Sequence, residues 1–409
     1  MMHKNLRSFI AQLSREKEIV EIRAEVDPCL ELAEIHRRVV REEGPALLFT
    51  RVKGSTFPVA SNLFGSVRRM EMAMGPRPEA IVKQAVAALD RLLPPSLKSL
   101  WEERGWLLDA ARCGTRRVSS GSAPVLEASM PEVDLYKMPV ITSWQEDGGA
   151  FFTLPLVYTQ KPGSRDHNLG MYRMQVFSKN QTGMHMQIHK GGGFHFYEAE
   201  KRGQALPATV FLGGPPALTI AAITALPEMV PELIYASFLM GGKINLVDIP
   251  GHPHPLVAEA EFALCGEVPP GIRKAEGPFG DHYGYYSLIH DFPVFSVKRI
   301  YHRTDAIYPA TVVGIPRQED YYIGEWMQDL LSPLFPVIMP GLKSLWTYAE
   351  AGFHTLCGAV VRESYFREAL AHCFRILGEG QLSLTKVLMT TDADLDLKDF
   401  STLLQSILE

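Results

Sequence analysis

The chain has 409 residues, of which 46% are apolar and 21% are charged, and its formal net charge is −5. This length suits two or three domains, and the composition is that of a globular protein. The negative charge argues against a nucleic-acid partner, and no basic block indicates an electrostatic membrane anchor. Five scattered cysteines without a C-x-x-C pair indicate neither a disulfide framework nor a zinc ribbon. Without an apolar signal core near the N-terminus, a cytoplasmic location is expected.

Residues 1–117 predict an N-terminal α/β domain. Apolar residues repeat at helical spacing from Leu6 to Leu13, and apolar and polar residues then alternate as in a strand. Pro78 in the first turn and Pro94-Pro95 after the last one delimit a later helix. The expected order is a helix from Leu6, strand Ile19–Val26, helix Leu30–Val40, strand Ala46–Arg51 and helix Arg77–Leu93.

Residues 118–320 predict a β-rich, barrel-like domain. Nine of the thirteen histidines lie between His167 and His302, which indicates that the chemistry belongs to this domain. The uncharged segment 205–227 is interrupted by Gly and Pro, so a buried strand, a turn and a helix over Ala217–Thr224 explain it better than a membrane span. The expected strands are Leu154–Thr159, Met171–Ser178, Met184–His189, Ala208–Leu212, Ile244–Asp248 and Val294–Tyr301.

Residues 321–409 predict a second α/β region. Helical patterns cover Ile323–Leu334 and Glu363–Leu377, a strand is expected at Lys386–Thr391, and a last helix starts near Leu397. The chain contains no internal repeat.

Two segments carry groups suited to chemistry on an anion. Asn168-Leu-Gly-Met-Tyr-Arg173 places an amide and a guanidinium on either side of an expected glycine bend. Glu276-Gly-Pro-Phe-Gly-Asp281 places two carboxylates on a sharply folding loop. An arginine facing two carboxylates can hold an anionic substrate and move a proton. Tyr283, Tyr285 and Tyr286 follow, and an apolar, semi-dry wall formed by them would raise a carboxyl pKa toward neutrality.

The expected hairpin of strands Met171–Ser178 and Met184–His189, with its turn centred on Gln181, has one polar face. In this register Arg173 lies opposite His189, and the face is either solvated or a polar ligand surface within a barrel. The polar side chains on it are Arg173, Gln175, His185, Gln187 and His189. The glycines at 191–193 form either a flexible loop or a backbone cradle for a phosphate.

Glu232 follows Pro231 at the start of an apolar helix. Its carboxylate either favours the helix N-terminus or serves as a hard metal ligand. Together with Asn168 and His189 it would form an oxygen and nitrogen set suited to Mg²⁺ or Mn²⁺, although the spacing is not a recognised metal signature.

These segments resemble the UbiD decarboxylase family, and the similarity extends over essentially the whole chain. The resemblance is carried by Asn168–Arg173, His189-Lys-Gly-Gly, Leu212-Gly-Gly-Pro-Pro-Ala217, Glu232, residues 276–286 and Ser61-Asn-Leu-Phe-Gly65. It implies non-oxidative decarboxylation on prenylated FMN, which is bound in a central split β-barrel like that of flavin reductases. The expected fold class is therefore mixed α/β, with domains at 1–117, 118–320 and 321–409. Because the family continues beyond the position of Glu409, the resemblance also implies an incomplete C-terminal domain.

The resemblance also implies a role for individual residues. Arg173 orients the substrate carboxylate with Glu276 paired to it, and Asp281 donates the proton that replaces CO₂. The metal, Mn²⁺ or Mg²⁺, is held by Asn168, His189 and Glu232, and K⁺ is a further candidate ion. The cofactor is contacted by Asn168, Met171, Tyr172, Arg173, His185, Met186, Gln187, Lys190, Gly191 and Pro227.

The substrate class and the partners are further implications of the resemblance. Asp281 stands where many aryl and acrylic acid decarboxylases of the family carry Glu, and quinone-pathway members carry Asp there. The expected substrate is thus an aromatic acid of ubiquinone or menaquinone biosynthesis, and Trp144–Ala150 with Thr182-Gly-Met184 is more similar to the futalosine-route members. Expected partners are a flavin prenyltransferase that supplies the cofactor, further copies of the chain in a homo-oligomer, and a membrane surface reached through a prenylated substrate.

Three alternatives remain open. The chain acts on another aryl or acrylic acid, or it binds flavin without activity because its C-terminal domain is incomplete. The third is a flavin oxidoreductase, although the chain has no G-x-G-x-x-G fingerprint.

Overall fold

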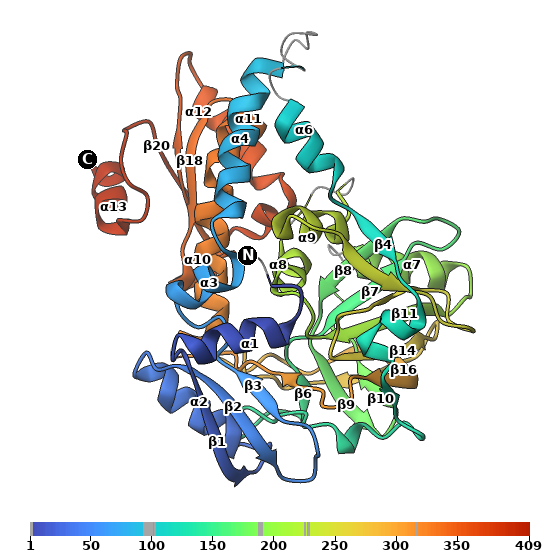
Figure 1. The fold of residues 1–409 in the computed structure, drawn as a ribbon. Helices are drawn as coiled ribbons and strands as arrows, with labels where there is room; N and C mark the ends of the chain where they lie inside the picture. Colours follow the sequence, from blue (N-terminus) through green and yellow to red (C-terminus); the bar gives the residue numbers. More distant parts are fainter. Residues whose placement is uncertain are drawn as a thin grey trace. The chain divides into compact units, whose positions relative to one another are not determined.

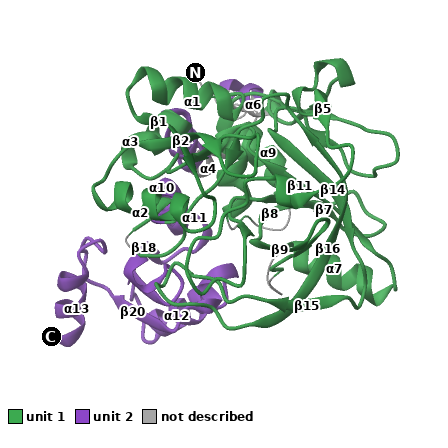
Figure 2. Ribbon diagram, turned by 90° about the horizontal axis from the view of Figure 1, so that it is seen from below, with its two compact units in different colours: residues 1–75, 110–320 green, residues 76–109, 321–409 purple. Residues whose placement is uncertain are grey.

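The computed structural model describes residues 3–92, 101, 104–186, 191–224, 226, 230–315 and 317–409. The chain forms two compact units, residues 1–75 with 110–320 and residues 76–109 with 321–409 (Figure 2). Each unit is assembled from two stretches of chain. The division of the first unit into domains at residue 117 stays a prediction.

The N-terminal part of the first unit is a four-stranded sheet with three helices. Strands β1 and β2 are parallel, β3 is antiparallel to β2, and β17 joins β3 in parallel from much later in the chain. Asn5 caps α1 by accepting a hydrogen bond from the Ser8 N–H. The bounds are α1 (Leu6–Arg15), β1 (Ile19–Val26), α2 (Glu31–Arg41), β2 (Ala46–Val52), β3 (Val59–Ser61), α3 (Val67–Met74) and β17 (Tyr308–Pro309).

The central part is built on a half-barrel sheet that has ten strands among the described residues. Its main path runs β6-β9-β10-β16-β14-β11-β7-β8, and β5 and β15 pair with the long strand β16. The bounds are β5 (Ala128–Ser129), β6 (Phe151–Phe152), β7 (Leu156–Gln160), β8 (His167–Met171), β9 (Met174–Ser178), β10 (Gln181–Gly183), β11 (Leu206–Leu212), β14 (Phe262–Val268), β15 (Arg273–Glu276) and β16 (His290–His302).

Three helices and a small sheet accompany the half-barrel. Figure 1 shows α8 and α9 side by side next to β7 and β8, with α7 at the same sheet. This arrangement brings the first residue of α9 to the middle of β8. The bounds are α7 (Gly191–Lys201), α8 (Pro216–Ile223), α9 (Glu232–Met240), β4 (Thr115–Arg117), β12 (Ile244–Val247) and β13 (Leu256–Val257).

One continuous apolar core joins the two sheets of the first unit. It contains Phe49 from β2, and it also contains Val210 from β11 and Phe295 from β16, all completely buried. Burying a large apolar side chain contributes about 1.5–3 kcal/mol, so this shared core explains why residues 1–75 and 110–320 form one body.

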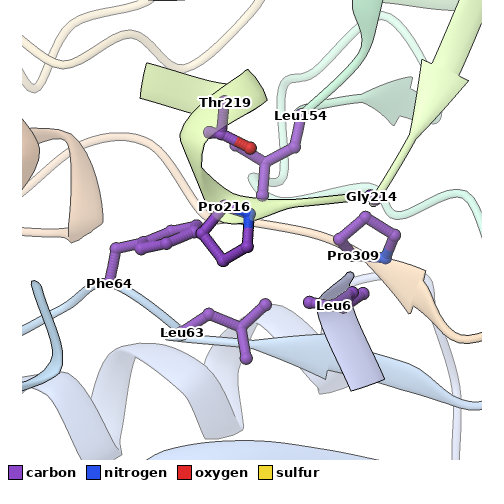
Figure 3. Close-up of a pocket in the computed structure, with 9 residues that line it drawn as sticks. Leu6, Leu63, Phe64, Leu154, Gly214, Pro216, Thr219 and Pro309 are labelled. Atoms are coloured by element: carbon purple, nitrogen blue, oxygen red, sulfur yellow. The ribbon is translucent and has the colours of Figure 1, made fainter. Parts of the chain in front are cut away.

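A second connection between these two regions lies at a small crevice of about 10 Å³ (Figure 3). Leu63 and Phe64 meet Gly214 and Pro216 there, together with Leu6 of α1. Two of the segments that carry the family resemblance, Ser61–Gly65 and Leu212–Ala217, therefore line the same crevice. Their role at this place is packing.

The second unit is an α/β body. Strand β19 pairs with β18 in antiparallel and with β20 in parallel orientation. The helix α10 crosses the boundary between the units, as α6 does at its end. The bounds are α4 (Arg77–Leu92), α6 (Arg104–Ala111), α10 (Glu319–Leu331), α11 (Phe335–Ile338), β18 (Leu342–Thr347), β19 (Leu356–Val361), α12 (Glu368–Leu377), β20 (Val387–Thr391) and α13 (Phe400–Leu408).

Most elements expected from the sequence are present, with three informative exceptions. The expected strand Met184–His189 is wrong in its described part, because the strand there is β10 and residues 184–186 follow it outside any strand. Strand β14, which lies between β11 and β16, was not anticipated. The expected strand Met171–Ser178 is two strands, β8 and β9, separated by Tyr172 and Arg173. In the uncharged segment, strand β11 and helix α8 are as expected, and none of the described helices has the length and apolar character needed to cross a membrane.

Candidate active site

Arg173 lies in the two-residue link between β8 and β9, and not within a continuous strand. The expected glycine bend is wrong, because Gly170 is part of β8. A Cβ atom at Gly170 would lie 2.4 Å from the Tyr172 hydroxyl, so this glycine makes room for the tyrosine ring. The link turns Tyr172 into the core, where it is 3% exposed.

The guanidinium of Arg173 is surrounded by acceptors. Its Nε donates to Glu276 Oε1 at 3.0 Å, and its Nη1 donates to Asp281 Oδ2 at 3.1 Å. Its Nη2 donates to the hydroxyl of Ser287 at 3.0 Å and is also 3.0 Å from Glu276 Oε1. The Phe279 ring lies 4.6 Å from the guanidinium carbon, so the charge is also stabilised by a cation–π contact. The arginine predicted to face two carboxylates does so.

Glu276 is completely buried at the end of β15. Its Oε1 is the atom that contacts the Arg173 guanidinium, and it also lies 3.3 Å from His185 Nδ1. Its Oε2 has no hydrogen-bond partner among the residues that the structure describes. An unpaired buried carboxylate oxygen is costly, so this atom is available to a donor from a bound ligand.

The register predicted for the hairpin is wrong. Gln181 pairs with Ser178, which leaves only Lys179 and Asn180 in the turn. The backbone N–H of His185 consequently donates to the Arg173 carbonyl at 3.2 Å, so that His185 lies beside Arg173. The expected polar face is still present in part, since Arg173, Gln175 and His185 all contact the segment 276–281.

Asp281 differs from the expectation of a carboxyl with a raised pKa. Burial raises the pKa of Asp281, but the His282 hydrogen bonds and charge, with the Arg173 charge, outweigh this effect. The pKa therefore lies below its usual value. The prediction of a dry tyrosine wall is wrong as well, because Tyr285 is 79% exposed and Tyr283 and Tyr286 are 38% and 37% exposed.

The Asp281 loop is fastened to residues 143–148. Gln175 donates to the Gly148 carbonyl at 2.6 Å and accepts the Gly277 N–H at 2.8 Å. Asp147 Oδ1 accepts the Gly280 N–H at 2.8 Å, and its Oδ2 accepts two N–H groups of its own turn. A Cβ atom at Gly148 would lie 2.1 Å from the Gly277 carbonyl oxygen. The backbones approach so closely that only glycine fits there.

A second group of polar side chains joins β8 to α9. The Asn168 amide donates to Glu232 Oε1 at 2.7 Å, and the Leu169 N–H donates to Oε2 at 3.1 Å. The Tyr172 hydroxyl donates to Asn168 Oδ1 at 2.8 Å and accepts the Gly192 N–H at 3.1 Å. Burial raises the pKa of Glu232, and this effect is larger than the opposite effect of the hydrogen bonds, which lower the pKa. The predicted proximity of Asn168 and Glu232 is confirmed.

The glycine run at 191–193 begins helix α7 and is not a loop. A Cβ atom at Gly191 would lie 2.8 Å from the Asn168 side chain, so the helix start is packed against the Asn168 and Glu232 pair. Met171 ends β8 nearby, and Met186 is buried in the core. The remaining predicted site residues, Gln187, His189, Lys190 and Pro227, lie outside the described residues.

Two residues of the site were not anticipated. Asp147 beside two glycines has the composition of a turn in which a carboxylate binds backbone N–H groups, and this signal could have identified it. Ser287 accepts hydrogen bonds from both Arg173 and the Phe279 N–H, but no local sequence feature marks it.

These groups can bind an anion at Arg173, hold a proton on a nearby carboxyl, and offer hard oxygen ligands at a second position. No group of three or more His, Cys, Asp or Glu side chains positioned for a metal ion occurs within the described residues.

Three domain models of one protein family match this chain, one after another along the sequence. Family models described as 3-octaprenyl-4-hydroxybenzoate carboxy-lyase match the chain, with the N-terminal domain at residues 10–89, the Rift-related domain at 116–316 and the C-terminal domain at 321–409. The last match corrects one expectation, because it shows that a C-terminal domain is present at residues 321–409.

Two relatives that are about half identical to this chain in sequence come from chlamydiae. A protein of Chlamydia caviae is 52% identical over 408 residues, which are 100% of this chain and 70% of that protein. A protein of Chlamydia pneumoniae, named as one component of a 4-hydroxybenzoate decarboxylase, is 52% identical over 404 residues, which are 99% of this chain and 68% of that protein.

Solved structures share the fold. Vanillic acid decarboxylase of Sedimentibacter hydroxybenzoicus in its closed form has a TM-score of 0.85 at 23% identity, over 99% of this chain and 84% of that one. The UbiD-class enzyme HmfF of Pelotomaculum thermopropionicum, in complex with prFMN, has a TM-score of 0.79 at 23% identity, over 98% and 88%.

Proposed function

Because the chain belongs to the UbiD family of carboxy-lyases, we propose that it decarboxylates an aromatic carboxylic acid without net oxidation, using prenylated FMN. The observation that carries this proposal is the Arg173 guanidinium, which is held between two carboxylates and one hydroxyl in a mostly buried place. The guanidinium of arginine presents a planar fork of N–H donors, and this geometry matches the two oxygen atoms of a carboxylate.

Arg173 binds the substrate carboxylate, and Glu276 sets the direction of the fork. Glu276 is suited to this role because it is fully buried and contacts both Nε and Nη2. Ser287, which precedes β16, supports the Nη2 side through its hydroxyl. The substrate carboxylate competes with Asp281 for Nη1, since Asp281 occupies this donor in the structure.

Asp281 supplies the proton that replaces CO₂. When the substrate carboxylate takes over Nη1, Asp281 loses one of the contacts that lower its pKa, and protonation becomes easier. His282 lies against Asp281 Oδ1 and can pass the proton to it. CO₂ then leaves, the electron pair of the broken bond stays on the ring carbon, and the proton of Asp281 joins that carbon.

Prenylated FMN, when bound, supplies the electron sink for this electron pair. The chain fits such a group in two respects. Glu276 Oε2 is a buried acceptor that lacks a partner among the described residues, and the N-terminus of α7 presents glycine backbone to an anion such as a phosphate. The residues that would contact the cofactor are the ten predicted from the sequence: Asn168, Met171, Tyr172, Arg173, His185, Met186, Gln187, Lys190, Gly191 and Pro227.

We propose that the chain also binds a metal ion. This ion is Mn²⁺, with Mg²⁺ as the alternative, and K⁺ is a further candidate ion. Asn168 and Glu232 supply hard oxygen atoms at one place. Burial raises the pKa of Glu232, and a cation would relieve the cost of the buried carboxylate. His189 would be the third ligand.

For the substrate we propose an aromatic acid of ubiquinone or menaquinone biosynthesis. This proposal is supported by Asp281, at the position where quinone-pathway members of the family carry Asp, and by the name of the Chlamydia pneumoniae relative. A flavin prenyltransferase would supply the cofactor, and the chain would act as a homo-oligomer. A membrane would be approached only with a prenylated substrate.

The test is CO₂ release by the chain co-expressed with a flavin prenyltransferase in the presence of Mn²⁺, with flavin content measured by intact mass and absorbance. We expect release from a hydroxylated benzoic acid by the wild-type chain and none by Arg173→Ala at equal flavin content. A folded chain that carries prenylated flavin but releases no CO₂ from any aromatic acid would contradict the proposal.

A further inference from the structure

Beside Asp281 lies a hollow of about 330 Å³. We call it the aromatic hollow; it is lined by Trp144, Tyr285, Tyr286 and Ile315, by Asp281 and by two glycines of the 280–284 turn. Its volume is at the lower end of the range for small-molecule sites, roughly 300–1,000 Å³. Among the described residues that line it, Asp281 alone carries a charge.

The Trp144 wall of the hollow is fixed. The Trp144 indole N–H donates to the Val313 carbonyl at 2.8 Å, and the Arg37 guanidinium lies 4.2 Å from the ring centre. A Cβ atom would lie 2.1 Å from the indole at Gly280 and 2.7 Å from it at Gly314. The ring therefore occupies a slot that exists because both neighbouring positions are glycine.

The Ile315 wall is built in the same way. A Cβ atom at Gly284 would lie 2.6 Å from the Ile315 side chain, so the isoleucine packs directly on the backbone of the Asp281 loop. Ile315 is nevertheless 63% exposed. The hollow is thus lined mainly by aromatic and aliphatic side chains and is open to solvent, as expected for a site that a ligand enters and leaves.

Asp281 is shared by the hollow and the candidate active site. It lines the hollow, and its Oδ2 accepts a hydrogen bond from Arg173 Nη1 at 3.1 Å. An aromatic acid whose carboxylate replaces Asp281 on Arg173 places the atoms attached to that carboxylate next to the aromatic walls. Aromatic rings there provide contact area with little loss of side-chain freedom.

Resting on the proposed function, we propose that the aromatic hollow receives the part of the substrate remote from the reacting carboxylate, and that it selects aromatic acids in which this part carries no second anionic group. Trp144 and Ile315 are its specificity residues. The described lining offers no cation to a second carboxylate, and Asp281 repels one. Uncharged substituents such as hydroxyl, methoxy or alkyl groups are accepted.

The test compares two acids of similar shape, 4-methylbenzoate and benzene-1,4-dicarboxylate. Binding is measured by calorimetry on the full chain saturated with FMN, which lacks the prenyl modification, so that affinity is read without turnover. We expect the wild-type chain to bind the dicarboxylate about tenfold more weakly or worse.

Ile315→Lys places a cation at the hollow and should raise the affinity for the dicarboxylate relative to that for 4-methylbenzoate about tenfold or more. Leu288→Lys is the matched control, since Leu288 is 75% exposed on the same loop but does not line the hollow. This variant should leave the preference of the wild-type chain unchanged.

Equal affinity for the two acids, or an equal response to Ile315→Lys and Leu288→Lys, would overturn the inference while leaving the decarboxylase intact. Failure of the folded chain to bind FMN would instead overturn the proposed function, and the inference with it.

Discussion

Asp281 occupies an Arg173 donor that the substrate carboxylate needs, so removing its charge should strengthen carboxylate binding while it abolishes turnover. The relevant contact is the 3.1 Å hydrogen bond from Nη1 to Asp281 Oδ2. Asp281→Asn keeps the shape and an acceptor oxygen, but it no longer competes as an anion and can no longer deliver a carboxyl proton.

The size of the effect follows from the contact and its burial. A hydrogen bond to a charged group contributes about 1.5–3 kcal/mol. The Asp281 side chain is 28% exposed and that of Arg173 is 12% exposed, so solvent screening reduces this to about 1–2 kcal/mol. At about 1.4 kcal/mol for each factor of ten, benzoate should bind roughly 5 to 30 times more tightly to the variant.

The assay is calorimetric titration of FMN-saturated protein with benzoate and with uncharged benzamide. Only benzoate should gain affinity. Asp291→Asn removes a charge of the same sign from an exposed position in β16 and should change neither value. Weaker or unchanged benzoate binding by Asp281→Asn would refute the idea that Asp281 and the substrate share one donor of Arg173.

Three further predictions follow from other contacts. Glu232→Gln should lower the Mn²⁺ content of purified protein at least tenfold by metal analysis, since it removes a carboxylate that lies 2.7 Å from Asn168; full occupancy would reject this ligand. Gln175→Leu should cost about 1–3 kcal/mol in urea unfolding, because it removes the hydrogen bonds to the partly buried Gly277 N–H and to the Gly148 carbonyl, and a loss below about 0.5 kcal/mol would speak against this role. Burial lowers the pKa of His36 to about 4, whereas the unfolded chain takes up this proton near pH 6.5. Stability should therefore fall as the pH decreases from about 6.5 to about 4, by up to about 3 kcal/mol for this residue. His36→Gln should flatten that dependence, and the exposed His290→Gln should not.

The sequence predicted much of the fold because its local signals agree with the structure. The alternation at 19–26 predicts β1 with its observed bounds, and the Pro residues around Arg77–Leu93 predict α4 to within one residue. Strand β14 was missed, since its continuous apolar run has no alternation to distinguish it.

The candidate site was predicted in its residues but not in its geometry. Motif resemblance identified Arg173, Glu276 and Asp281, which the structure brings together. The register that places His185 beside Arg173 depends on a two-residue turn at Lys179 and Asn180, and the spacing of polar residues could not reveal it. The lowered pKa of Asp281 likewise depends in part on its long-range contact with Arg173, which no local pattern encodes.

The measurement that tests the central claim most directly is deuterium incorporation during decarboxylation in D₂O, with flavin content measured on the same samples. We expect the wild-type chain to form product with deuterium on the carbon that carried the carboxylate. Asp281→Asn, with equal flavin, should form such product at least about a hundredfold more slowly. Undiminished incorporation by the variant would show that another group donates the proton, and would contradict the assignment of Asp281.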